Sequence, residues 1–542
     1  MLPVLISPVG VRRRRMAGFR KFAILALLSF PLPTPLLGLD GYWQGSALFR
    51  GQWRFMEAEF SENPEVRPKI DLPQQRHELK NFKQENGVLE FTLQRGSSEL
   101  KCTGTLRGDS IVGTIEIQAS HGAFQLRKVA DREFQRLPHA LGAYRSGDGR
   151  LISVAKFGFG DGVERLSLLD SKIGLWGMLL RQADSRFSFM PARYAPYPET
   201  MEVEFTLGAS SAAHTVRLID KGKVVAVARR IEPYREEAVR FTSADAVLSG
   251  TLIKPARRPP HPAIIILHSS GYQSRNGPVG YFRLLANYFA AQGIATLIYD
   301  KRGVGESTGQ WASASFDDLA GDGLKAVEFL KSQRDIDPKR IGLWGISQGG
   351  WIAPLAASRS SEVAFIVPVA GPAVGTGEQE IYRVINGLRR EGFTSDEVTA
   401  AEDHMRLFFA VVDEKAGWDS LEASTKRARN SRWAPFVQLP ASWSDLTWWK
   451  QMRSFDPATL TARLTCPSLH LFGSLDDDVP TEESVRILAS LPGKERRTVK
   501  VFQGVDHFML VVPKGDTSRS MPVLSPGYLE GTVAWVRSIA RR

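Results

Sequence analysis

The feature that most constrains this chain is the pentapeptide Gly-Ile-Ser-Gln-Gly at residues 345–349. Residues 340–346 are mostly apolar and predict a buried strand, and residues 351–357 predict the start of a helix. A sharp turn from a strand into a helix needs residues without bulk beside its apex, where strained backbone can expose a serine hydroxyl. The pattern therefore predicts Ser347 as a nucleophile. Because such pentapeptides also arise by chance, the prediction depends on partners elsewhere in the chain.

A serine nucleophile needs a base within hydrogen-bond reach and an acid that orients the base. Residues 468–473 predict a strand that runs into three aspartates at residues 476–478. Residues 498–502 predict another strand, and His507 follows in the next loop. Side chains in the loops that follow parallel strands meet at one edge of the sheet. The order serine, acid, histidine is also the order that this kind of turn requires.

We therefore predict a catalytic triad of Ser347, Asp476 and His507, and Asp477 is the main alternative for the acid. Taken singly, the aspartates could form a solvated turn or a calcium-binding loop, and His507 could be a surface histidine. Their joint placement after three successive predicted strands favours the catalytic interpretation.

The segments around these residues alternate between strands and helices. Residues 263–267 form a continuous apolar run, which is typical of a strand buried on both faces. Further strands are predicted at residues 294–299 and 363–370, and helices at residues 281–292 and 316–333. This alternation predicts an α/β fold with a doubly wound, mostly parallel sheet.

The alternation stops between residues 374 and 465, where an insert is predicted. It contains three predicted helices, at residues 378–391, 394–412 and 420–430, followed by an aromatic stretch with Trp433, Phe436, Trp443, Trp448 and Trp449. We expect a helical cap over the carboxyl ends of the strands and a largely apolar cleft with few charges. The alternative is that the tryptophans fill the core of the insert itself.

The region before the α/β domain has a different character. Residues 40–130 show short alternating runs separated by turn signals, which predict a small antiparallel barrel or sandwich. Residues 131–234 predict a second β-rich region, and residues 142–145 distantly echo residues 41–44 without a convincing repeat. We expect a structural, substrate-recruiting or dimer-forming role, so that a homodimer could form through this β region.

The amino terminus resembles an export signal. A basic region is followed by an uncharged stretch that reaches residue 39, which predicts a signal peptide over residues 1–39 and a secreted or periplasmic protein. A start at Met16 would give a better-proportioned leader. Three prolines interrupt the apolar stretch and argue against a permanent membrane helix, so we expect no stable membrane span.

Charge and cysteine content exclude two further possibilities. Six of the twelve net positive charges come from residues 1–39, which leaves +6 for the remainder. So small a surplus does not indicate nucleic-acid binding. Cys102 and Cys466 are the two cysteines of the chain and lie in different predicted domains, so we expect no structural disulfide.

Residues 235–542 resemble the α/β-hydrolase superfamily. The resemblance rests on residues 299–307 (Tyr-Asp-Lys-Arg-Gly-Val-Gly-Glu-Ser) and residues 342–351, around the serine. They are similar to a subgroup of bacterial secreted esterases and serine aminopeptidases. The oxyanion-hole segment of that subgroup resembles His-Gly-Ser-Gly-Pro-x-Asp-Arg and corresponds here to residues 268–275. This chain departs from it at Ser269, Tyr272 and Ser274.

The resemblance implies an oxyanion hole made of two backbone amides. The first is the amide of Gln348, and the second is that of Ser270 or, alternatively, of Ser269. Because a backbone donor needs no particular side chain, the departures do not remove the function. A glycine would adopt positive φ more readily than Ser269 does, which leaves the conformation of the loop open.

The resemblance implies a serine hydrolase that cleaves carboxylic ester bonds of an apolar small molecule through an acyl-enzyme. A serine aminopeptidase or other peptidase and a thioesterase are the alternatives, and a peptidase should carry a carboxylate pair for the substrate amine. An alternative of another class is a binding protein that kept the fold and lost activity. The chemistry requires no metal or organic cofactor.

Overall fold

The computed structural model describes residues 39–49, 52–60, 69–72, 75–95, 98–117, 120–129, 138–158, 164–183, 185–191, 201–207, 213–513 and 523–539. The predicted signal peptide lies outside the described residues, apart from Leu39. No helix in the described ranges combines the length and apolar character needed to cross a membrane. Cys102 and Cys466 are both free thiols.

The first β region is a closed antiparallel barrel, and in this part of the chain the barrel interpretation holds over the sandwich. Neighbouring strands pair along the chain, and β1 pairs with β8 to close the barrel. Alternate residues point inward and build a core that includes Trp43, Phe91 and Phe124. Its strands are β1 (Gly41–Phe49), β2 (Gln52–Phe60), β3 (Lys69–Leu72), β4 (Gln75–Glu85), β5 (Val88–Arg95), β6 (Ser98–Arg107), β7 (Ser110–Ile117) and β8 (Ser120–Val129).

The second β region is also a closed antiparallel barrel with its own core, closed by pairing of β9 with both β10 and β16. Its strands are β9 (Gly142–Arg145), β10 (Leu151–Phe157), β11 (Arg165–Asp170), β12 (Leu175–Ala183), β13 (Arg186–Pro191), β14 (Met201–Leu207), β15 (Ala213–Asp220) and β16 (Lys223–Ile231).

The first strands of the two barrels make the same kind of contacts. Trp43 Nε1 donates a hydrogen bond of 2.9 Å to the backbone carbonyl four residues earlier, and the Tyr144 hydroxyl donates one of 2.7 Å to the carbonyl at the same spacing. A basic side chain covers each ring, with Lys128 Nζ 5.8 Å from the Trp43 ring and Arg230 Cζ 5.9 Å from the Tyr144 ring. The weak echo between residues 41–44 and 142–145 therefore marks equivalent positions in two similar barrels.

The α/β domain is built on a sheet with strand order β17-β18-β20-β19-β21-β22-β23-β24. β17 and β18 pair antiparallel at one edge, and the strands from β20 to β24 run parallel. This confirms the predicted α/β fold with a mostly parallel sheet. The strands are β17 (Tyr234–Ser243), β18 (Ala246–Pro255), β19 (His261–Leu267), β20 (Ala295–Tyr299), β21 (Ile336–Ile346), β22 (Phe365–Val369), β23 (Ser468–Gly473) and β24 (Arg497–Phe502).

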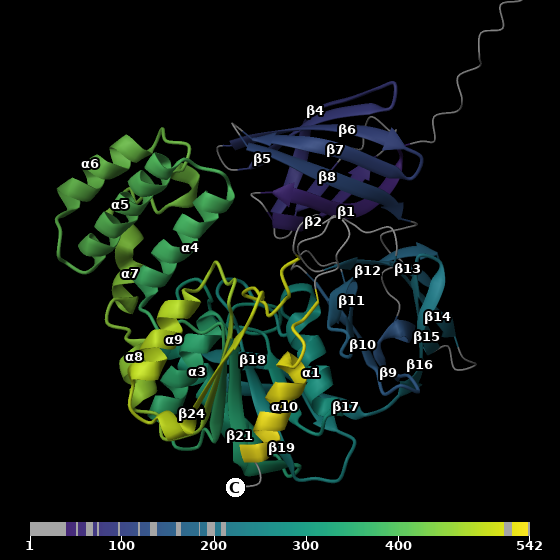
Figure 1. The fold of residues 1–542 in the computed structure, drawn as a ribbon, viewed down its shortest axis with the longest axis vertical. Coiled ribbons are helices and arrows are strands. Elements are labelled where there is room, and N and C mark those ends of the chain that lie inside the picture. Colours follow the sequence, from purple (N-terminus) through teal and green to yellow (C-terminus); the bar gives the residue numbers. More distant parts are fainter. Residues whose placement is uncertain are drawn as a thin grey trace, which may run out of the picture. The chain divides into compact units, whose positions relative to one another are not determined.

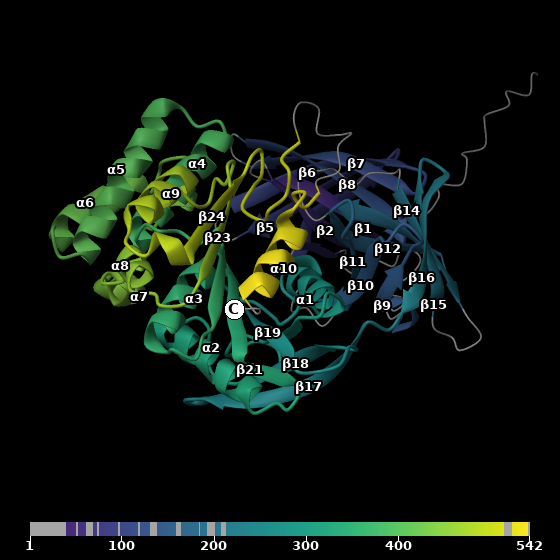
Figure 2. The ribbon, with the colours of Figure 1, turned by 60° about the horizontal axis from the view of Figure 1, so that its bottom comes forward.

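Helices cover both faces of this sheet, as Figure 2 shows. α1 (Tyr281–Ala291) and α10 (Tyr528–Ile539) pack on one face, and α2 (Phe316–Lys331) and α3 (Gln348–Arg359) pack on the other. In β19, Ile264 and Ile266 enter the first of these cores and Ile265 enters the second. A continuous apolar run is therefore required, because successive side chains of a strand point to opposite faces.

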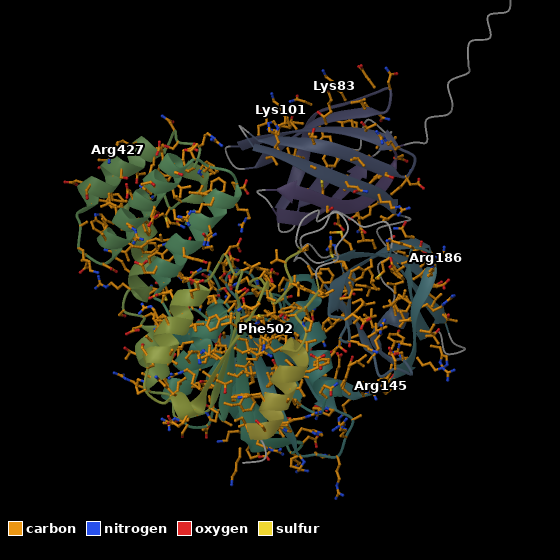
Figure 3. All side chains as sticks on the ribbon, viewed as in Figure 1. Lys83, Lys101, Arg145, Arg186, Arg427 and Phe502 are labelled. Atoms are coloured by element: carbon orange, nitrogen blue, oxygen red, sulfur yellow. The ribbon has the colours of Figure 1, made fainter. Side chains whose placement is uncertain are left out.

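The cap consists of helices inserted between β22 and β23 (Figure 1). They have two apolar clusters of their own, one around Leu388 and Met405 and one around Phe408 and Leu446. The helices are α4 (Thr376–Arg390), α5 (Ser395–Val412), α6 (Trp418–Ala428), α7 (Thr447–Met452) and α8 (Pro457–Ala462), and α9 (Thr481–Ser490) follows β23. Figure 3 shows Arg427 of α6 exposed, whereas Phe502 of β24 is buried.

The second barrel shares a core with the α/β domain through Trp176 of β12. The Trp176 indole donates a hydrogen bond of 3.0 Å to the Val279 carbonyl. Its ring lies 4.7 Å from that of Tyr281 and 6.4 Å from that of Phe508, measured between centroids. Because Phe508 follows the predicted catalytic histidine directly, the barrel supports the loop on which that histidine lies.

Candidate active site

Ser347 occupies the turn between β21 and α3, on strained backbone. Its φ of 57° and ψ of −119° are unusual for a residue with a side chain, and such strain concentrates at functional sites. The flanking glycines are required by space. A Cβ on Gly345 would lie 2.1 Å from the Gly349 carbonyl oxygen, and one on Gly349 would lie 2.7 Å from the Leu267 carbonyl oxygen. The pentapeptide is therefore a turn that only glycines at both positions can close.

His507 and Asp476 lie in direct contact. His507 Nδ1 is 2.9 Å from Asp476 Oδ2 and 3.1 Å from Oδ1, and both side chains are buried. Asp476 Oδ1 also accepts the backbone N–H groups of Asp478, at 2.9 Å, and Val479, at 2.8 Å. These bonds fix the carboxylate, and the carboxylate in turn holds the imidazole of His507 through Nδ1.

The alternative acid, Asp477, points elsewhere. Its carboxylate pairs with Arg390 of α4, and its side chain is 37% exposed. Of the two aspartates that the sequence left open, the structure brings Asp476 to His507.

The two predicted oxyanion donors flank the same site. Gln348 is the first residue of α3, where a helix leaves its backbone N–H groups without partners inside the helix. Ser270 lies in the loop after β19 and is exposed to the cavity. The left-handed backbone of this loop falls at Gly271, with φ of 80°, and Ser269 does not adopt a positive φ. The departure at Ser269 from the glycine of the subgroup therefore costs no backbone strain.

His268, the first residue of the predicted oxyanion-hole segment, has a structural role. Its Nε2 donates a hydrogen bond of 2.6 Å to the Tyr299 carbonyl. Burial lowers the pKa of His268 to about 3, so the ring stays neutral at physiological pH.

One cavity of about 580 Å³ brings these groups together. Ser347, Gln348, Ser270 and His507 all line it. Its aromatic wall includes several predicted cap residues, namely Phe436, Trp448 and Trp449, together with Phe316, Trp351 and Phe508. Trp433 instead fills the core of the cap, and Trp443 is exposed. Both interpretations of the aromatic stretch therefore hold, for different residues.

The expectation of an apolar cleft with few charges was wrong. One face of α4 lines the cavity with charged and polar side chains, including Glu380, Arg383 and Arg390, and Glu391 and Asp478 add carboxylates. These charged side chains can line the cavity because they form ion pairs. Arg383 donates to Glu380 through Nε, at 2.8 Å, and through Nη2, at 2.7 Å, and Arg390 pairs with Asp477.

Sequence reasoning missed this polar wall, although a signal was present. Helical spacing places four polar residues on one stripe of α4, namely Thr376, Glu380, Arg383 and Arg390. Within the described ranges, no group of three His, Cys, Asp or Glu side chains is arranged to hold a metal ion.

The model of the X-Pro dipeptidyl-peptidase (S15) family matches residues 245–508, which include the serine turn, the acid and the histidine. This chain belongs to the α/β-hydrolase superfamily. It is 26% identical to esterase EstD of Thermotoga maritima over 48% of its own length and 58% of the esterase, so it spans just over half of that relative. It is 25% identical to the thiohydrolase aneE of Aspergillus aculeatus, over 42% of this α/β hydrolase and 74% of the relative. Among solved structures, the α/β hydrolase GrgF of a Penicillium species aligns with a TM-score of 0.37 and 20% identity, over 57% of this chain and 98% of that one.

Proposed function

We propose that this α/β hydrolase cleaves carboxylic esters of small molecules through Ser347, His507 and Asp476. One observation carries the proposal: Ser347 on its strained turn lines the same cavity as His507, whose Nδ1 bonds to the buried Asp476. An esterase among its relatives is in keeping with this activity.

The proposed reaction has two steps. His507 Nε2 takes the Ser347 hydroxyl proton as Oγ attacks the ester carbonyl, and the amides of Gln348 and Ser270 stabilise the oxyanion. His507 returns the proton to the departing alcohol, which leaves an acyl group on Ser347. Water, deprotonated by His507, then releases the acid and restores the serine.

The polar wall of α4 modifies the expected substrate. We propose an ester whose apolar part packs on the aromatic wall around Trp448 and Trp449, and whose polar part faces Arg383 and Glu380. A purely apolar ester would displace water from these charged side chains and leave each with only the other as a polar partner, which is costly.

Labelling with a fluorophosphonate probe tests the nucleophile. The probe should form a stoichiometric adduct on Ser347 and none on the Ser347→Ala variant. If the folded protein forms no adduct, the enzyme proposal fails and a binding role takes its place.

An aminopeptidase is the second candidate, and two observations favour it. The matching family model is that of X-Pro dipeptidyl-peptidases, and carboxylates of Glu380, Glu391 and Asp478 line the cavity, where an amine could bind. Thioester cleavage is the third candidate, in view of the thiohydrolase relative. A panel of 4-nitrophenyl esters, acyl thioesters and amino-acyl and dipeptidyl-proline anilides decides among them, and we expect the highest kcat/KM on an ester. The expected export and homodimer stay predictions.

A further inference from the structure

Lys301 is a buried lysine behind the oxyanion loop. It follows β20, and the residue is only 2% exposed. Its ammonium donates three hydrogen bonds, to the carbonyl oxygens of Ser269 (3.1 Å) and Gly271 (3.2 Å) and to Oε1 of Gln348 (2.9 Å). One side chain thus contacts Ser269 and Gly271, on either side of Ser270, and also the side chain of Gln348. The backbone amides of Ser270 and Gln348 are the two proposed oxyanion donors.

The bond to Ser269 has a geometric consequence. In a trans peptide the C=O of one residue and the N–H of the next lie in one plane and point in opposite directions. Holding the Ser269 carbonyl toward Lys301 therefore directs the Ser270 N–H away from Lys301. Ser269 and Ser270 line the active-site cavity, whereas Lys301 is not part of its lining. A cation on the carbonyl also polarises the peptide and makes its N–H a stronger donor.

Lys301 occupies this place at a cost. All three acceptors are neutral oxygens, and a buried cation without a bonded carboxylate is unfavourable. Burial lowers the pKa of Lys301 from its usual 10.5 to about 8, although Asp322 of α2 opposes the shift. The other titratable groups facing it are His268 and Tyr299, and burial keeps both neutral. A buried group with a strongly shifted pKa beside a cavity is a candidate for a functional role.

We propose that Lys301 is the positioning residue of the oxyanion hole, orienting the Ser270 amide through Ser269 and fixing Gln348 from behind. The inference rests on the proposed function of Ser347. It predicts that Lys301 acts on the transition state, because the oxyanion forms only there.

The test compares Lys301→Met with Lys254→Met in the full-length protein. Lys254 is also buried, but it lies in β18, where it bonds to Asp335 at 3.0 Å and pairs with Glu237. The substrate is a 4-nitrophenyl ester, and each rate is divided by the fraction of Ser347 that a fluorophosphonate labels at the end point. Lys301→Met should lower kcat by about 10–100-fold, which is less than the full cost of losing an oxyanion donor. KM should change by less than about threefold, and Lys254→Met should keep the wild-type kcat.

The pH profile gives a second readout that needs no variant. The wild-type kcat should fall as pH rises through about 8, where Lys301 loses its proton. Unfolding does not explain this fall in kcat. The pKa of Lys301 is lowered in the folded state, so between pH 8 and 10.5 the folded state binds fewer protons at Lys301 than the unfolded state does. The contribution of Lys301 to the free energy of unfolding therefore rises with pH. In Lys301→Met the alkaline fall should disappear.

The outcomes separate the two proposals. If Ser347 is labelled but Lys301→Met keeps kcat within twofold, or if the wild-type kcat stays level to pH 9.5, the role of Lys301 is overturned and the serine mechanism stands. If Lys301→Met does not fold, the wild-type pH profile decides. If the wild type forms no adduct, the proposed function fails, and the inference fails with it.

Discussion

At the scale of single residues, the acid of the proposed triad is decided by one position in a loop. Asp476 bonds to His507, whereas Asp477 pairs with Arg390. Asp476→Asn should lower kcat by about 10⁴-fold, because an amide no longer stabilises the imidazolium or fixes its tautomer. Asp477→Asn should stay within about threefold of wild type. Steady-state kinetics with the best ester of the panel, normalised to labelled Ser347, measures both.

Equal losses in the two variants, or a larger loss in Asp477→Asn, would contradict this assignment. The sequence predicted the loop but left both aspartates open, because neighbouring residues share the same local pattern. What separates them is the backbone of the loop, whose Asp478 and Val479 N–H groups turn the Asp476 carboxylate toward His507. That conformation depends on contacts distant in the chain, among them the hydrogen bond of 3.1 Å from the Tyr382 hydroxyl to the Asp476 carbonyl.

At the scale of elements, the turn between β21 and α3 depends on a close approach to the end of β19. A Cβ on Gly349 would meet the carbonyl oxygens of Leu267, at 2.7 Å, and His268, at 2.8 Å, and backbone atoms cannot rotate away. Gly349→Ala should destabilise the protein by about 1–3 kcal/mol and slow fluorophosphonate labelling at least tenfold, because the oxyanion loop begins at His268. Urea unfolding and labelling rates measure the two effects.

Gly321 of α2 is the matched control, because a Cβ there meets nothing within 4 Å. Gly321→Ala should raise the free energy of unfolding by about 0.5–1 kcal/mol, as alanine favours a helix interior. If both variants were equally stable, the steric account of the turn would be wrong.

The sequence predicted the helices and strands of the α/β domain better than it predicted features at the other two scales. The apolar run of β19 and the helical spacing of α2 reflect burial against neighbouring layers, so a local pattern suffices to find them. The direction in which α4 faces was not predicted. Its charged stripe looks like a solvated face in the sequence, and the pairing of Arg383 with Glu380 and of Arg390 with Asp477 allows it to line a cavity.

At the scale of the whole molecule, the sequence predicted two β regions but showed only a distant echo of their similarity, at residues 41–44 and 142–145. The features shared by the barrels are a hydrogen bond and a covering cation, made by Trp43 and Lys128 in one and by Tyr144 and Arg230 in the other. Different residue types perform each part, so residue identity hardly records the likeness. The contacts of the second barrel with the α/β domain join residues that are far apart in the chain, such as Trp176 and Phe508. A local sequence pattern could therefore not predict them.

From these contacts we predict that the second barrel supports the loop of the proposed catalytic histidine, whereas the core of the first barrel is built from its own residues. Trp176 contacts Phe508, beside His507, while Trp43 is buried among residues of its own barrel. Each change to alanine should destabilise its surroundings by about 3–5 kcal/mol. In the protein that remains folded, Trp176→Ala should lower kcat at least fivefold, because the His507 loop loses a packing partner, and Trp43→Ala should leave kcat unchanged. Ester kinetics normalised to labelled Ser347 make the comparison, and equal kcat values in the two variants would show that the second barrel does not position the histidine.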